Sequence, residues 1–93
     1  MNAIINQTEL IQRSANNDQL AFKLLYELTS PKFYSLALKI IKKKKLAEKV
    51  LQESYIKIWC RADSYDPSRE SVIGWMSIIT RNTAVDTLRT LSK

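Results

Sequence analysis

The sequence predicts an all-α fold, a compact helical bundle of about four to five helices, from three observations. The 93-residue chain has one Gly and two Pro, which leaves little room for the many turns of an all-β fold. Long stretches free of these residues carry apolar side chains at helical intervals. Apolar residues make up 45% of the chain, as in globular proteins. At this length the chain forms a single domain, residues 1–93.

Capping and turn residues divide the chain into helices. Asn16-Asn17-Asp18 is a turn signal, and Asp18 is a good N-cap for the next helix. Ser30 and Pro31 are expected to restart the chain, with Ser30 as cap and Pro31 as the first helical residue. Turn formers fill residues 63–71, and Ser71 can cap the last helix. The predicted helices span residues 8–15, 19–28, 31–43, 46–62 and 72–91.

Apolar spacing predicts which side of each helix faces the core. In the second helix this stripe consists of Leu20, Leu24, Leu25 and Leu28. In the fourth it consists of Ala47, Val50, Leu51, Tyr55, Ile58 and Trp59. The opposite face of the fourth helix is polar except for Ile56, and an apolar residue within a polar rim suits a docking surface. The alternative is an ordinary solvent-facing surface.

One stripe of the last helix combines three kinds of side chain. Trp75, Ile78, Asn82, Val85 and Arg89 follow alternating steps of three and four residues, so they share one side of the helix. An aromatic ring, an amide and a guanidinium suit base stacking, base-edge hydrogen bonding and phosphate contact. Alternatively, Trp75 and Ile78 belong to the core, and Asn82 and Arg89 are ordinary surface residues.

The chain is basic, with a net charge of +6. Residues 1–46 hold eight Lys or Arg against three Asp or Glu, whereas residues 47–93 hold seven against six. This excess favours polyanionic partners, with nucleic acid foremost. The run Lys42–Lys45 is interpreted first as a solvated helix end, where cations complement the helix dipole. The alternative is an electrostatic contact with DNA phosphate or an acidic protein.

The residues needed for several function classes are missing from the sequence. Cys60 is the single cysteine and there is no His, so we expect no intrachain disulfide, no metal site and no cofactor. There is no Gly-rich phosphate loop and no arrangement of catalytic residues, so we do not expect an enzyme. A cytoplasmic location without membrane insertion is expected, because no apolar run approaches the roughly 20 residues that span a bilayer.

A series of short motifs follows in order and without an evident gap over residues 10–91. They are Asp18…Ala21-Phe22…Leu25-Tyr26, Leu36-Ala37, Ala47-Glu48-Lys49-Val50-Leu51-Gln52-Glu53, Ile58-Trp59, Tyr65-Asp66-Pro67-Ser68-Arg69, Trp75 and Arg81-Asn82…Val85-Asp86…Leu88-Arg89. Together these motifs resemble region 2 of the extracytoplasmic-function (ECF) RNA polymerase sigma factors.

The resemblance implies a helical domain that binds core RNA polymerase at the clamp helices of the β′ subunit. It also implies that the domain melts the minus-ten promoter element and reads it as single-stranded DNA. The polymerase-binding residues would be Glu48, Lys49, Gln52, Glu53 and Ile56. The DNA-binding residues would be Tyr65, Asp66, Ser68, Arg69, Ser71, Trp75, Ile78, Arg81, Asn82 and Arg89.

Two residues depart from the family pattern. Lys49 stands where the family usually has Asp, and Glu70 stands where Gly is common. The second DNA-binding domain of such factors, region 4, is expected to lie outside this chain, which resembles an excised domain. Two other functions remain open: a module held by an anti-sigma factor, and a nonspecific basic binder of nucleic acid.

Overall fold

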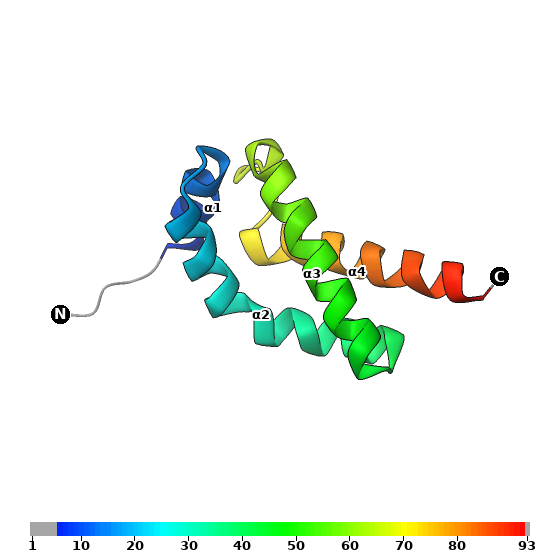
Figure 1. Ribbon diagram of the computed structural model, residues 1–93. Helices are drawn as coiled ribbons and strands as arrows, with labels where there is room; N and C mark the ends of the chain where they lie inside the picture. The colour runs from blue at the N-terminus through cyan, green and yellow to red at the C-terminus, as the bar shows by residue number, and fades with distance from the viewer. Residues whose placement is uncertain (1–5, 93) are drawn as a thin grey trace.

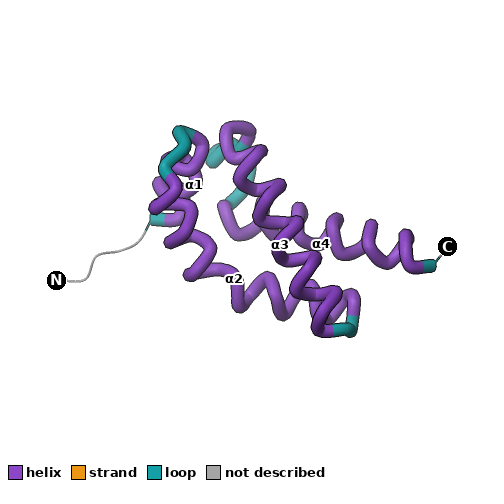
Figure 2. Tube along the Cα trace, viewed as in Figure 1, coloured by secondary structure: helices purple, strands orange, loops and turns teal. Residues whose placement is uncertain are grey.

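The computed structural model describes residues 6–92, and it confirms the predicted helical bundle. Four α-helices and one short 3-10 helix follow each other along the chain, joined by short loops (Figures 1 and 2). Every pair of α-helices is in contact, so the bundle is compact. The elements are α1 (Gln7–Ala15), α2 (Gln19–Ile41), α3 (Lys44–Arg61), η1 (Ala62–Ser64) and α4 (Val72–Leu91).

Side-chain caps fix where three of the helices begin. Asp18 accepts a hydrogen bond from the Ala21 N–H at 3.1 Å, and Ser71 accepts one from the Gly74 N–H at 3.0 Å, so both predicted caps are confirmed. Helix α1 begins one residue earlier than predicted, because its cap is Asn6, which accepts from the Glu9 N–H at 3.3 Å. Each cap satisfies a backbone donor that the helix itself leaves unpaired.

The predicted break at Ser30 and Pro31 is wrong. Helix α2 continues through both residues, and Pro31 lies in its interior. A proline there removes one backbone hydrogen bond and crowds the carbonyl four residues earlier, which bends a helix when packing holds both halves in place. Thr29 before it and Phe33 after it are both buried. Helix α2 accordingly changes direction along its length instead of ending (Figure 1).

The lysine run joins two helices. Helix α2 ends at Ile41, and Lys42 adopts the left-handed conformation with φ of 62°. Lys43 is the N-cap of α3 but makes no side-chain capping bond, and Lys44 begins the helix. The expected helix end is therefore right for Lys42 alone. The lysines that open α3 lie at a helix N-terminus, where the dipole disfavours positive charge.

The predicted leucine stripe of α2 is wrong for three of its four members. Leu20, Leu24 and Leu28 are 76%, 45% and 47% exposed, whereas Leu25 is fully buried. The buried side of α2 instead follows four-residue steps. It includes small and polar residues, which a stripe of large apolar residues does not contain. That buried stripe consists of Ala21, Leu25, Thr29, Phe33, Ala37 and Ile41.

The hydroxyls of the buried serines and threonines are satisfied within their own helices. The Thr80 and Thr83 hydroxyls donate to the carbonyls of Met76 and Ile79, four residues earlier, at 3.0 and 2.8 Å. Ser14, Thr29 and Ser54 make the same bond in α1, α2 and α3. Within residues 6–92 no buried side-chain nitrogen or oxygen lacks a partner, so these residues avoid the cost of an unpaired polar group.

No helix described by the structure is long and apolar enough to cross a membrane.

Candidate nucleic-acid interface

The loop between η1 and α4 is held by its own side chains. The Tyr65 hydroxyl donates to the Glu70 carbonyl at 2.8 Å and so closes the loop. Asp66 Oδ1 accepts from both the backbone N–H and the hydroxyl of Ser68, at 2.9 and 2.7 Å. Ser71 then ends the loop as the cap of α4. The loop is thus preorganised, although most of its residues are exposed.

Hydrogen bonds within the loop favour the ionised form of the Asp66 carboxyl. Hydrogen bonds from the Ser68 hydroxyl, and then from its backbone N–H, hold the pKa of Asp66 below its usual value. A charged Asp66 keeps the turn at Ser68 closed. The side chains of Asp66 and Ser68 therefore bond to each other, and their roles in binding DNA stay predictions.

A groove of about 440 Å³ lies between the C-terminal half of α3 and α4, with Ser64 of η1 and Glu70 of the loop in its wall, and we call it the loop groove. Asn82 lines it with an exposed amide, and Trp75 lines it with a ring that packs 5.4 Å from the ring of Tyr65. Its remaining lining residues are Lys57, Arg61, Ser64, Glu70, Ile78, Ile79 and Asp86. Amide, aromatic and charged groups surround one recess, which is the combination that recognises an unstacked base.

The predicted stripe of α4 is only partly exposed. Trp75 packs half-buried against the core, as the alternative interpretation has it. Asn82 is exposed and Ile78 is 53% exposed, so both are accessible to a ligand. Arg89 pairs with Asp86 at 3.6 Å in a pair open to solvent, which holds the guanidinium only weakly.

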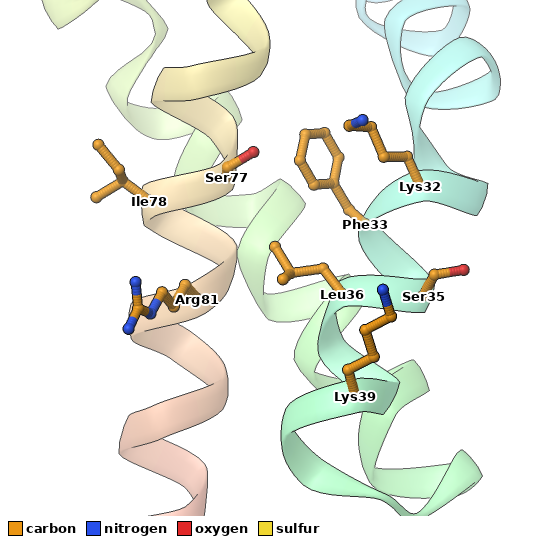
Figure 3. A pocket seen from close by; sticks show the side chains of 8 residues that line it. All are labelled: Lys32, Phe33, Ser35, Leu36, Lys39, Ser77, Ile78 and Arg81. Atoms are coloured by element: carbon orange, nitrogen blue, oxygen red, sulfur yellow. The ribbon is translucent and has the colours of Figure 1, made fainter.

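Arg81 lies on another side of α4 from Asn82. It lines a second groove, of about 500 Å³, between α2 and α4, which we call the α2–α4 groove (Figure 3). Neighbouring helix residues point about 100° apart. Arg81 and Asn82 therefore line different grooves and do not surround one recess. The lining residues of this groove are Lys32, Phe33, Ser35, Leu36, Lys39, Ser77, Ile78 and Arg81.

The residues predicted to bind polymerase divide between two sides of α3. Gln52 and Ile56 are exposed beside an apolar groove of about 510 Å³ that the rings of Phe22, Tyr26, Tyr55 and Trp59 complete. Lys49 and Glu53 instead line a groove of about 270 Å³ shared with α4. Glu48 is exposed. A partner that contacts all five predicted residues must therefore cover both sides of α3.

Lys57 lines the candidate site, and the predicted site residues do not include it. Its amino group donates to the Thr83 hydroxyl at 2.9 Å and so links α3 to α4. It lines both the loop groove and the groove that contains Lys49 and Glu53. The available signal was its spacing, since Glu53, Lys57 and Arg61 recur every four residues and share one side of α3.

Comparison with known proteins identifies this arrangement. The family model for sigma-70 region 2 matches residues 25–93. The chain belongs to the sigma-70 region 2 family. An engineered region 2 of sigmaE, solved in complex with GTAAAA, superimposes with a TM-score of 0.89 at 29% identity, over 99% of this chain and 95% of that one. This confirms both the predicted fold and the predicted resemblance.

The similar full-length proteins are ECF sigma factors. The SigK proteins of Mycobacterium tuberculosis strain H37Rv and Mycobacterium bovis strain AF2122/97 are each 30% identical over 80 residues, which is 86% of this chain. That stretch is 43% of the length of each SigK protein, so the chain spans less than half of these relatives. Sigma factors are transcription factors rather than enzymes, in agreement with the expectation from the sequence.

Proposed function

We propose that this region 2 domain binds a single-stranded minus-ten promoter element and core RNA polymerase during transcription initiation. The observation that supports DNA binding most strongly is the loop groove, where a preorganised loop stands beside Asn82 and Trp75. The similar region 2 of sigmaE forms a complex with GTAAAA. Unpaired bases are the natural targets, because hydrogen bonds and stacking must offset the few kcal/mol needed to unstack each base.

The test uses a labelled oligonucleotide that contains GTAAAA and a scrambled strand of the same composition. Fluorescence anisotropy should show preference for GTAAAA, and Asn82→Ala should reduce that preference. Tyr65→Ala should reduce it too, because the closing bond to Glu70 is lost. Gln52→Ala, at an exposed position of α3, serves as the control and should leave the preference for GTAAAA unchanged. Equal affinity of the parent domain for both strands would rule out promoter reading.

The second half of the proposal is docking of α3 on the β′ clamp helices of polymerase. Gln52 and Ile56 support it, because they are exposed beside an apolar groove that a helix can fill. The double variant Gln52→Ala/Ile56→Ala should weaken capture by a β′ coiled-coil fragment more than Lys49→Ala/Glu53→Ala does. If the two doubles have equal effects, the partner covers both sides of α3. If neither reduces capture, α3 is not the docking surface.

A second candidate function is that of a module held by a regulatory protein such as an anti-sigma factor. The exposed leucines of α2 favour it, because Leu20, Leu24 and Leu28 form one apolar stripe on the surface. Replacing these three with Gln should abolish co-purification with such a regulator and leave oligonucleotide binding intact. Retained co-purification would count against this function.

A further inference from the structure

The N-terminal half of α2 carries an apolar row that stays exposed within residues 6–92. Leu20, Leu24 and Leu28 are 76%, 45% and 47% exposed. Each lies four residues after the one before, so the three share one side of the helix. This half of α2 lies at one side of the molecule, away from the C-terminal end of α4 (Figure 1). Single exposed leucines are ordinary, but a row of three is typical of a surface that contacts another protein. We call it the leucine row.

Two opposite charges run along one edge of the leucine row. Lys23 and Glu27 are both exposed, and each directly precedes a leucine of the row. They take part in neither of the two ion pairs that residues 6–92 contain. A lysine four residues before a glutamate is also the less favourable order for a pair within one helix. Both charges are therefore available to a partner.

The leucine row and its charged edge are complementary to a second copy of themselves. A two-fold axis brings the same surface of both copies together, so that residue i meets j and residue j meets i. When the two helices are antiparallel and the axis lies at the level of Leu25, Lys23 lies opposite Glu27 of the second copy, because both are two positions from Leu25. The leucines of the two copies then alternate along the contact in steps of about 3 Å. Apolar groups meet apolar groups, and each charge meets its opposite.

The antiparallel order also keeps the basic parts of the two copies apart. Each copy has a net charge of +6, so two copies repel each other in general. The lysines that follow the leucine row, Lys32, Lys39 and the run Lys42–Lys45, point in opposite directions in an antiparallel pair. A parallel pair would place them side by side. At the leucine row itself the charges of Lys23 and Glu27 cancel, so this part of α2 is suited to self-contact.

We propose that the leucine row binds a second copy of this chain and forms a weak antiparallel dimer. The inference goes beyond the proposed promoter binding and does not depend on it, because no residue of the leucine row lines the loop groove. Three leucines from each copy place the contact at the low end of interface sizes, so we expect a dissociation constant on the order of 0.1 mM. A regulator that binds the same leucines must compete with the second copy.

The first test is sedimentation equilibrium from about 10 µM to about 1 mM protein, a range that brackets the expected dissociation constant. A reductant is present, because Cys60 is exposed and could link two copies by a disulfide. The average mass should rise with concentration from 10.8 kDa toward twice that value. Leu24→Gln, at the centre of the contact, should raise the dissociation constant on the order of ten-fold.

The matched control is Leu91→Gln, which makes the same change at a 54% exposed leucine of α4. It should leave the dissociation constant unchanged. Equal effects of Leu24→Gln and Leu91→Gln would mean that the copies associate through any exposed leucine, and the proposal would be wrong. A parent domain that keeps a mass of 10.8 kDa at the highest concentration would overturn it as well.

The second test exchanges the charges at the edge of the row. Lys23→Glu and Glu27→Lys each set like charges opposite each other, so each alone should weaken association on the order of ten-fold at low salt. An equimolar mixture of the two variants should associate as the parent does, because opposite charges meet again at both places. Lys23→Glu lowers the net charge and with it the general repulsion, so its weakening effect cannot come from net charge. A mixture that fails to associate would contradict the pairing of Lys23 with Glu27.

Two further measurements separate this proposal from the other functions. All four variants change exposed side chains, so their thermal unfolding at low protein concentration should match that of the parent. Leu24→Gln should also keep the preference for GTAAAA, so dimer formation and promoter reading succeed or fail independently. If the parent stays monomeric while an anti-sigma factor binds through these leucines, the leucine row is a regulator site and the proposal is wrong.

Discussion

The buried side chains form two clusters that differ in size and composition. The large cluster contains long and aromatic side chains from all four α-helices, among them Phe33, Tyr55 and Met76. The small cluster lies where the C-terminal part of α2, the start of α3 and the later part of α4 meet. It consists of Ala37, Ile41, Ala47, Val50 and Ala84.

The two clusters therefore differ in which substitutions they should tolerate. Trp75 of the loop groove and Tyr65 of the neighbouring loop pack against the large cluster, so this loop rests on the larger part of the core. Removing atoms there leaves a cavity. Three alanines in the small cluster are fully buried, which indicates helices in close approach. Adding atoms there forces the helices apart.

The largest effect is expected for Phe33→Ala in the large cluster. Phe33 is fully buried, and its ring packs 6.5 Å from that of Tyr55. The free energy of unfolding should fall by about 3–5 kcal/mol, because the lost ring leaves a cavity. Urea denaturation measures this change. Leu20→Ala, at an exposed position of the same helix, is the control and should change it by about 0.5 kcal/mol or less. Similar losses for both would mean that the large cluster is not the main core.

The next effect in size is expected for Ala84→Leu in the small cluster. Ala84 has no exposed surface, so the larger side chain should lower the free energy of unfolding by about 1–3 kcal/mol through overpacking. Thr90→Leu, on the exposed end of α4, adds bulk into solvent and should be nearly neutral by the same urea measurement. Tolerance of Ala84→Leu would show that the helices are not closely packed here.

Tyr55→Phe tests the polar bond inside the large cluster. Tyr55 and Thr29 share a buried hydrogen bond between their hydroxyls, and its loss should cost about 1 kcal/mol at neutral pH. Burial, partly offset by that bond and reinforced by Tyr26, raises the pKa of Tyr55 from 10.0 to about 12.

The folded state keeps Tyr55 protonated at a pH where the unfolded chain ionises it. The stability that the neutral Tyr55 side chain contributes is therefore fully present below pH 10. It is lost as the pH rises from about 10 to about 12. Urea denaturation across this range should show a steeper fall in stability for the parent than for Tyr55→Phe. Parallel curves would contradict the raised pKa.

The smallest effect is expected beside the small cluster, at the uncapped start of α3. Lys43 is the N-cap without a side-chain bond. Lys43→Asn supplies the missing acceptor and should raise the free energy of unfolding by about 0.5–1 kcal/mol. Lys43→Ala removes the same charge at the same residue and is the control, since alanine has no side-chain acceptor to cap α3. Thermal unfolding should separate the two variants. An equal gain would assign the effect to charge rather than to capping.

The sequence was sufficient where a local signal sets the structure. Asp18 and Ser71 cap their helices as predicted, and α4 has the predicted bounds, because capping depends on neighbouring residues alone. The sequence was misleading where packing decides. Pro31 bends α2 instead of ending it, and the exposed Leu20 and Leu24 look more apolar than the buried Ala21 and Thr29.

The same distinction between local signals and packing applies to the residues of the candidate site. The loop and Asn82 could be placed because they follow each other along the chain. The placement of Arg81 beside Lys32 and Lys39 depends on how α2 crosses α4, which no local pattern in either helix reveals. The bond from Lys57 to Thr83 also depends on packing, since the two residues are 26 positions apart in the sequence, although the spacing of Lys57 along α3 was visible.

The position of Lys57 between two grooves has a thermodynamic consequence. One amino group spans α3 and α4 and faces both the loop groove and the groove that contains Lys49 and Glu53. Two ligands that each fix the position of this side chain cannot bind independently, and their mutual influence is reciprocal. A polymerase surface that settles Lys57 would change the affinity for DNA by the same factor by which DNA changes the affinity for polymerase.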